Sequence, residues 1–238
     1  VNAMLHVREM DDDSFLVFAT RSGTVKRMPL SALRNIRTSG IRALTLDEGD
    51  EVINVMRTDG SRNILLATHN GQAICFAETD VRPMGREAVG VRGIRLKDGD
   101  WVVGAEIAQP DADVLSITEN GYGKRTDLDE YRITNRGGKG VKTINITEKT
   151  GKLISIQAVT DENDLMIINR SGLTIRTAVD QIRVAGRATQ GVRIINLREG
   201  DAIASVIAVP ANEEEEPAVL DGAGAPESES EENVSKEQ

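Results

Sequence analysis

Basic side chains recur at a fixed interval along this 238-residue chain, and they stand beside glycines. Arg and Lys donate hydrogen bonds to phosphate oxygens, and a glycine lets a phosphate approach main-chain N–H groups. The pattern therefore predicts contacts with a polyanion. The recurring bases are Lys26, Arg27, Lys124, Arg125 and Arg176 in strand-like segments, Arg37, Arg86, Arg136 and Arg187 before a glycine, and Arg42, Arg92, Lys142 and Arg193 after it.

One of these loops is richer in glycine than the others. Residues 136–140 read Arg-Gly-Gly-Lys-Gly, and Arg132 lies just before them. We expect Arg132, Gly137, Gly138 and Lys139 to join the phosphate contacts. The alternative interpretation is that alternating bases form only the solvent-exposed face of a half-buried sheet.

Other chemistry is not indicated by the sequence. Tyr122 and Tyr131 are interpreted as partly buried aromatic residues, and Cys75, in an apolar segment, as a small core residue. His6 and His69 have no neighbouring ligand set. The Arg-Gly-Gly-Lys-Gly segment lacks the spacing and the Ser or Thr of a P-loop. We therefore predict no catalytic residue, no metal site and no bound cofactor in this chain.

The formal net charge of -9 argues at first against nucleic acid, but its distribution reverses that inference. From Pro210 onward the chain has ten acids and one base, so residues 1–209 hold 28 acids and 28 bases. Residues 210–238 are predicted to be a disordered acidic tail. The tail either competes with the polyanion for the basic side chains or only adds solubility. Aromatic residues make up 3% of the chain, which argues against stacking on single-stranded nucleic acid.

Four repeats of about 50 residues organise the rest of the chain. Turn glycines fall at 23, 71, 121 and 172, and a second series falls at 40, 90, 140 and 191. Short runs rich in Val, Ile and Thr surround them, which predicts four strands per repeat and an all-β fold. One four-stranded sheet cannot bury both of its faces, so the repeats must stack as blades. The predicted blades are 15–63, 64–113, 114–164 and 165–209, and 1–14 is predicted to be the last strand of a truncated blade.

Several segments resemble a known family. YRITNRGGKGVKT (131–143) looks like the C-terminal domain of the A subunits of DNA gyrase and topoisomerase IV, and 82–100 and 186–201 agree with it. The resemblance covers residues 1–209. It implies a β-pinwheel, a propeller-like disc in which neighbouring blades exchange a strand and DNA bends around a basic rim. Thr134 and Asn135 depart from the gyrase heptad, which in this family lies in the first of six blades. We expect this chain to lack the first blade and most of the second.

The resemblance also implies a function and partners. We expect sequence-independent binding and wrapping of double-stranded DNA, in support of ATP-dependent negative supercoiling by a parent type II topoisomerase. The parent is expected to be a cytoplasmic, nucleoid-associated heterotetramer of two A and two B subunits, with no membrane contact and with ATP and magnesium on other domains. Two alternatives remain open: a topoisomerase IV subunit that bends DNA, and a protein-interaction β-propeller.

Overall fold

The computed structural model describes residues 3–211, so nearly all of the predicted tail lies outside the described residues. Within this range the chain forms β-strands and short 3-10 helices only, which confirms the all-β fold class. The first of these helices is a single 3-10 turn, η1 (Leu30–Leu33).

Each repeat has the same order of elements: a two-strand hairpin, a 3-10 helix, a long loop and a third strand. A two-residue strand interrupts the long loop in the last three repeats. The bounds are β1 (Phe15–Thr20), β2 (Thr24–Pro29), η1 and β3 (Val52–Thr58); β4 (Asn63–Thr68), β5 (Gln72–Ala77), η2 (Glu78–Asp80), β6 (Val91–Arg92) and β7 (Val102–Ala108); β8 (Asp113–Thr118), β9 (Tyr122–Thr126), η3 (Leu128–Glu130), β10 (Val141–Lys142) and β11 (Leu153–Val159); and β12 (Asn163–Asn169), β13 (Thr174–Ala178), η4 (Val179–Gln181), β14 (Val192–Arg193) and β15 (Ile203–Pro210).

Neighbouring repeats exchange a strand. The sheets run β3-β1-β2-β6, β7-β4-β5-β10 and β11-β8-β9-β14, and the last is β15-β12-β13. We call these sheets blades 1 to 4. The fourth strand of each of the first three blades is the two-residue strand of the following repeat. All the strand pairs within the blades are antiparallel, and the exchange ties each blade to the next.

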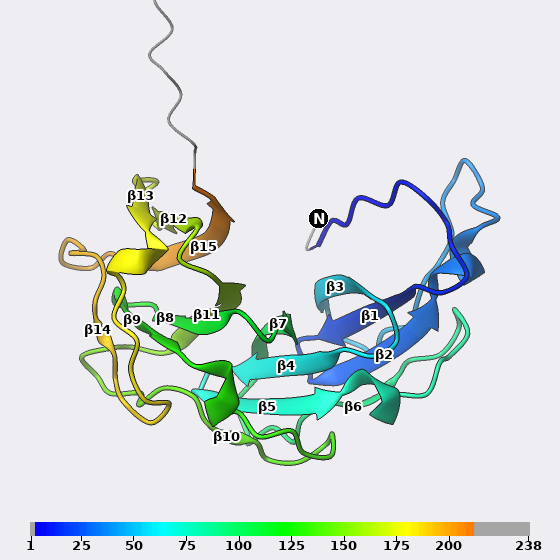
Figure 1. Ribbon diagram of the computed structural model, residues 1–238, viewed down its shortest axis with the longest axis horizontal. Coiled ribbons are helices and arrows are strands. Elements are labelled where there is room, and N and C mark those ends of the chain that lie inside the picture. The colour runs from blue at the N-terminus through cyan, green and yellow to red at the C-terminus, as the bar shows by residue number, and fades with distance from the viewer. Residues whose placement is uncertain (1–2, 212–238) are drawn as a thin grey trace, which may run out of the picture.

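The blades stack side by side in an open arc, with β3, β7 and β11 on its inner side and β6, β10 and β14 on its outer side (Figure 1). Each pair of neighbouring blades encloses an apolar core. Val17 and Phe76 belong to the first core, Leu65 and Ile156 to the second, and Ile117 and Leu165 to the third. Because these strands are apolar on both faces, the stacking of blades buries surface that one sheet alone would expose.

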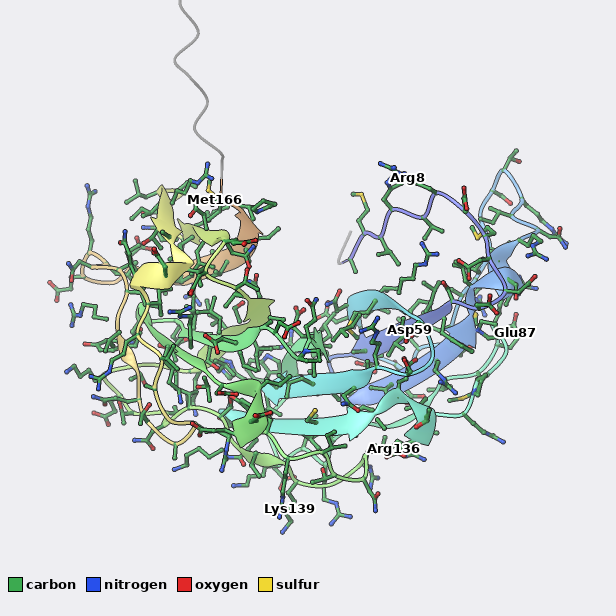
Figure 2. The ribbon with its side chains drawn as sticks, in the orientation of Figure 1. Arg8, Asp59, Glu87, Arg136, Lys139 and Met166 are labelled. Carbon is green, nitrogen blue, oxygen red and sulfur yellow. The ribbon has the colours of Figure 1, made fainter. Side chains whose placement is uncertain are left out.

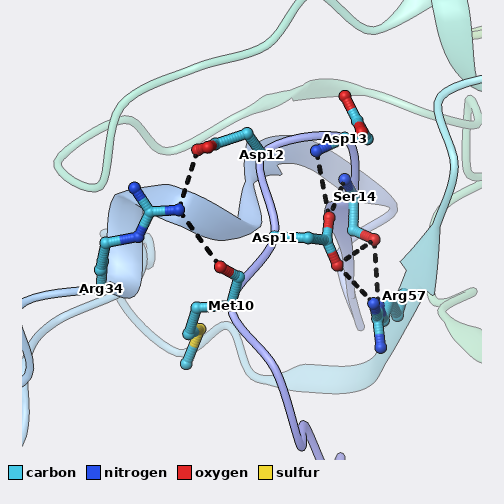
Figure 3. Close-up of polar contacts among 7 residues, drawn as sticks. All are labelled: Met10, Asp11, Asp12, Asp13, Ser14, Arg34 and Arg57. Carbon is cyan, nitrogen blue, oxygen red and sulfur yellow. Dashed lines mark hydrogen bonds and ion pairs between the residues drawn. The ribbon is translucent and has the colours of Figure 1, made fainter.

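Residues 3–14 do not form the strand that the repeat pattern predicted for 1–14. The described part of the chain offers no sheet with which that segment could pair as a last strand. It instead lies over the outward face of blade 1, where Val7 and Met10 pack on Leu16 and Phe18. Polar contacts fix its end: Asp11 pairs with Arg57, and Arg34 donates to the Met10 carbonyl oxygen at 3.2 Å (Figure 3).

The expectation of four strands in every repeat is also corrected. Residues 41–46 form no strand, and in the later repeats only two residues of the equivalent segment are paired. The reason is that this segment always pairs with the preceding blade. For the first repeat, no preceding blade lies within the described residues.

Acidic turns hold the hairpins in place on the side away from the exchanged strands. Asp50 accepts hydrogen bonds from the Ser22 N–H at 2.9 Å and its hydroxyl at 2.6 Å. Partial burial alone would raise the pKa of Asp50, but hydrogen bonds from Ser22 and Thr20 hold it below its usual value. Asp100 and Asp201 bind the equivalent turns at Asn70 and Ser171. These acids therefore have a structural role in the hairpin turns. The loops that lead to the exchanged strands carry mostly bases.

Candidate nucleic-acid interface

Four loops carry most of the recurring bases, and we call them the rim loops: 34–42, 82–95, 132–142 and 183–193. Each follows a 3-10 helix. Arg136 and Lys139 of the third loop lie on the outer edge of the arc, beyond β5 and β10 (Figure 2). The only acid in the four loops is Glu87. The bases are Arg34, Arg37, Arg42, Arg82, Arg86, Arg92, Arg95, Arg132, Arg136, Lys139, Lys142, Arg183, Arg187 and Arg193.

Backbone hydrogen bonds fasten each of the last three rim loops to the blade before it. The donors lie two residues before the arginine that precedes the second glycine, and the acceptors lie on the outer strand of the hairpin. This contact fixes the position in the rim loop from which the arginine side chain extends. The three bonds run from Met84 N–H to the Arg27 carbonyl (2.8 Å), from Thr134 N–H to the Cys75 carbonyl (2.9 Å) and from Ala185 N–H to the Arg125 carbonyl (2.9 Å).

The second glycine series is required by close backbone contact. Gly140 has a φ of 71°, and a Cβ there would overlap the Ala73 carbonyl group. The backbone of the rim loop can therefore lie directly against β5. A side chain at this position would be strained by its own conformation and would also push the loop off the blade.

Lys26 and Lys124, both predicted to contact phosphate, are buried and hold rim loops instead. Lys26 Nζ donates to the carbonyl oxygens of Ala43, Arg86 and Ala88 at 2.8–2.9 Å. Lys124 Nζ donates to the carbonyl oxygens of Gly186 and Arg187. Desolvation lowers the pKa of both amines, to about 8 for Lys124. The prediction that these two side chains contact DNA is corrected, because their donors bind backbone oxygens away from solvent.

The next residue along the same strands is also engaged by the protein. For the buried Arg27 and Arg125 the predicted phosphate contact is corrected, and for the exposed Arg176 it stays a prediction. Arg27 and Arg125 are buried, and Arg176 is exposed but bound to an acid. In each case an acid packed beside the strand neutralises the guanidinium group. The ion pairs are Arg27–Glu78 at 3.6 Å, Arg125 with Asp161 and with Asp113 at 3.5 Å, and Arg176–Asp164 at 2.6 Å.

Two rim arginines also link neighbouring repeats through hydrogen bonds to backbone carbonyl groups. Arg136 donates to the carbonyl oxygens of Asp80 at 3.0 Å and Arg92 at 3.1 Å. Arg187 donates to the Lys142 carbonyl oxygen at 2.5 Å. The N–H of Gly137, which we expected to face a phosphate, donates instead to the Gly93 carbonyl oxygen at 2.6 Å. These groups shape the rim, and fewer of their donors remain for a ligand than the sequence indicated.

The remaining predicted bases are exposed, and the structure brings several of them together. Arg37, Arg42 and Arg86 line one open hollow of about 480 Å³. Arg132 and Lys139 line another of about 320 Å³, whose wall includes Gly138. Arg92, Lys142 and Arg193 follow along the outer edge, and Arg193 donates to the Tyr122 hydroxyl at 2.7 Å.

Sequence reasoning missed four rim bases: Arg34, Arg82, Arg95 and Arg183. A signal was present for two of them, because Arg82 and Arg183 lie 50 and 51 residues from Arg132 and occupy the same place in their repeats. Arg95 is exposed, and its N–H donates to the Gly138 carbonyl oxygen at 2.8 Å, which links neighbouring rim loops.

The repeat matches a known family along nearly all of the described chain. The family model described as "DNA gyrase C-terminal domain, beta-propeller" matches residues 14–59, 62–109, 112–160 and 163–210. This chain belongs to the DNA gyrase C-terminal domain family. The resemblance inferred from the sequence and the β-pinwheel fold it implied are thereby confirmed.

Relatives and solved structures agree with the family assignment. The A subunit of DNA gyrase from Staphylococcus aureus (strain MRSA252) is 45% identical over 219 residues, which is 91% of this chain and 25% of that protein. The chain thus spans about a quarter of the length of the curated relatives it matches. A topoisomerase IV C-terminal domain superposes with a TM-score of 0.81 at 26% identity, covering 86% of this chain and 64% of that one. A gyrase A C-terminal domain superposes with a TM-score of 0.77 at 24% identity, covering 86% and 68%.

Tyr131 is buried, and its hydroxyl lies 2.5 Å from the Thr143 hydroxyl, so it acts as a core residue. Among residues 3–211, no three His, Cys, Asp or Glu side chains are grouped to hold a metal ion. No helix in the described part of the chain is long and apolar enough to cross a membrane.

Proposed function

We propose that this domain binds duplex DNA along the rim loops without reading its sequence, and bends the duplex around the outer edge of the arc. The observation that carries the proposal is the charge of the rim loops, which hold fourteen bases and one acid at intervals of one repeat. A surface of one sign attracts a polyanion even where the whole domain is neutral.

Bending sets the number of contacts that the rim must make. Bending a duplex of 20–30 base pairs by 40–90° costs on the order of 1–6 kcal/mol. Contacts from several rim loops together can offset that cost, because each exposed Arg or Lys neutralises a phosphate and releases a counterion. The low aromatic content favours a duplex over a single strand as the ligand.

The parent protein that we infer is a gyrase A subunit. Its wrapping of DNA would support ATP-dependent negative supercoiling in a cytoplasmic assembly of two A and two B subunits, with ATP and magnesium bound on other domains. A topoisomerase IV subunit is the competing parent, since a topoisomerase IV domain superposes well. The 45% identity to a gyrase A subunit over 91% of this chain supports the gyrase assignment. The gyrase assignment is tested by grafting this domain onto a gyrase A subunit whose own C-terminal domain has been removed. The grafted subunit should regain negative supercoiling.

Salt dependence tests the DNA-binding proposal directly. The logarithm of duplex affinity should fall with log salt by about 0.9 per phosphate neutralised. Replacing the exposed bases Arg132, Lys139 and Lys142 together by Gln should reduce that slope by about 2.7 if each neutralises one phosphate. Arg62→Gln, at an exposed arginine outside the rim loops, is the matched control and should leave the slope unchanged. A salt slope that is the same for the triple variant as for the wild type, or tighter binding to single strands than to duplex DNA, would overturn the proposal.

A further inference from the structure

An exposed apolar side chain stands at the same place in three successive rim loops. It is Pro83 in the second repeat, Ile133 in the third and Val184 in the fourth, at intervals of 50 and 51 residues. Ile133 is 59% exposed, Val184 is 50% exposed, and Pro83 is exposed as well. One exposed apolar residue on a protein surface needs no explanation, but three at one position of a repeat do. We call Pro83, Ile133 and Val184 the apolar rim positions.

The preceding blade holds the backbone of each apolar rim position in place. Each position forms a parallel β-bridge with the outer strand of that blade's hairpin, and the next residue donates its N–H to the carbonyl of the same partner. The side chain therefore extends from a fixed backbone, and little conformational freedom is lost when a ligand covers it. The bridges join Pro83 to Arg27, Ile133 to Cys75 and Val184 to Arg125.

An exposed arginine directly precedes each apolar rim position. The three arginines are Arg82, Arg132 and Arg183. Among the described residues, no acid and no backbone oxygen accepts a hydrogen bond from their guanidinium groups. A ligand that covers these positions must therefore offer anionic oxygens and, directly beside them, an apolar surface.

The backbone of DNA has both of these features, because each phosphate adjoins a deoxyribose ring. The ring presents C–H groups to its surroundings, and contacts with phosphate and sugar do not depend on the base sequence. The ribose of RNA carries a 2′-hydroxyl on the same ring, which a protein can use to tell RNA from DNA. An apolar side chain packed on ribose would bury that hydroxyl without a hydrogen bond, which is unfavourable. An apolar contact at the sugar therefore favours DNA over RNA.

We propose that the apolar rim positions pack on deoxyribose rings of the bound duplex, each beside a phosphate that is bound by the preceding arginine. The inference rests on the proposed binding of duplex DNA along the rim loops, and it adds a contribution to affinity that does not depend on salt. A rim that bound by charge alone would accept DNA and RNA duplexes of equal charge alike. The apolar rim positions instead make the rim selective for DNA.

Salt titration separates this contact from the ionic ones. The slope of log affinity against log salt reports the phosphates neutralised, whereas the affinity extrapolated to about 1 M salt keeps the contributions that release no counterion. The double variant Ile133→Thr/Val184→Thr keeps both residues β-branched and leaves the net charge unchanged. Because both side chains are exposed, the variant should fold as the wild type does. The slope should stay the same, and the extrapolated affinity should fall about 10-fold, since each threonine retains one methyl group.

A matched control and two further duplexes identify the surface that is contacted. Ile207 is 56% exposed on β15, outside the rim loops, so Ile207→Thr should change neither the slope nor the extrapolated affinity. The wild type should bind an RNA duplex of the same length more weakly than DNA, and the double variant should show a smaller ratio of DNA to RNA affinity. A DNA duplex built only from G·C pairs should show the same loss in the double variant as a mixed sequence, because deoxyribose is common to both.

The outcomes separate this inference from the proposal on which it rests. A normal salt slope with an unchanged extrapolated affinity in the double variant would refute the sugar contact and leave DNA binding along the rim loops standing. A loss confined to duplexes that contain thymine would place the contact on the thymine methyl group and refute the assignment to deoxyribose. A flat salt response of the wild type would instead overturn the proposed function, and this inference with it.

Discussion

Lys124 Nζ donates a 2.7 Å hydrogen bond to the carbonyl oxygen of Arg187, which lies 63 residues further along the chain. A buried lysine of β9 thus holds a rim loop of the next repeat against blade 3. Lys26 does the same for the loop that contains Arg86. The bases of the repeat therefore divide into two groups, one that faces solvent and one that holds the first in place.

Lys124→Met should separate these two roles. The variant leaves the Gly186 and Arg187 carbonyl groups without their donor, which costs about 1–3 kcal/mol of unfolding free energy. Duplex affinity should fall because the loop is no longer held, but the slope of log affinity against log salt should stay unchanged, since no phosphate contact is lost. Urea unfolding and binding titrations at several salt concentrations measure both effects.

Lys142→Met is the matched comparison for that variant. Lys142 is exposed on β10, so its loss should change stability little and reduce the salt slope by about 0.9. If Lys124→Met reduced the slope as Lys142→Met does, Lys124 would contact phosphate in the complex and the division of roles would be wrong.

Glu106→Gln should stabilise the protein in a pH-dependent way. Burial raises the pKa of Glu106, on β7, from 4.5 to about 7. In the folded state the carboxyl is protonated below pH 7, and in the unfolded chain only below about 4.5. The stabilisation that the folded state gains from binding this proton is therefore complete at pH 4.5, and it is lost as the pH rises through 7. Glutamine resembles the protonated form, so the variant should be more stable than the wild type by about 1–3 kcal/mol at pH 8.5.

The pH comparison contains its own control. At pH 4.5 the wild-type carboxyl is already neutral in the folded state, so Glu106→Gln should change the unfolding free energy little there. Urea unfolding at both pH values gives the two differences. An equal gain at both would show that the effect comes from packing rather than from the charge.

The fold was predictable because the same sequence pattern occurs four times along the chain. Two glycine series with one period locate the hairpins, and alternating apolar runs identify strands without any knowledge of long-range contacts. What could not be predicted is whether each basic side chain on a strand is buried or faces solvent. Lys26 and Arg27 are adjacent in a strand and should point to opposite faces, yet both are buried. The reason is that the carbonyl oxygens that bind Lys26, at Arg86 and Ala88, and the acid that binds Arg27, at Glu78, come from the next repeat. Nothing in the local sequence encodes those partners.

The thiol of Cys75 should be almost inert in the folded domain. Cys75 is 4% exposed on β5, and burial raises its pKa to about 11. Because the thiolate is the reactive form, its fraction at pH 8 is on the order of 100-fold lower than for a free cysteine. A chromogenic disulfide reagent should therefore label the native protein slowly and the urea-unfolded protein at once. Ser39→Cys in a Cys75→Ser background, with the thiol on an exposed rim loop, provides the rapid native rate for comparison.

The pair Arg27–Glu78 has an apolar equivalent within the same chain, which allows a double-mutant cycle. Glu78 is fully buried and accepts hydrogen bonds from the Thr58 hydroxyl at 2.6 Å and the Arg62 N–H at 2.7 Å. One repeat later the positions of Arg27 and Glu78 are taken by Cys75 and Leu128, which belong to one apolar cluster. Arg27→Cys alone leaves a buried carboxylate without its cation, and Glu78→Leu alone leaves a buried cation without its anion. Each single change should cost about 3–5 kcal/mol.

The double variant Arg27→Cys/Glu78→Leu should recover part of that loss, because it recreates the apolar pair of the next blade and leaves no buried charge unpaired. We expect a coupling free energy of about 1–3 kcal/mol from urea unfolding of the four proteins. Additive losses would show that the ion pair is not the reason for the burial of Glu78, and that its bonds to Thr58 and Arg62 are sufficient. A recovered double variant would show that the charged pair of blade 1 and the apolar pair of blade 2 are interchangeable ways of joining one blade to the next.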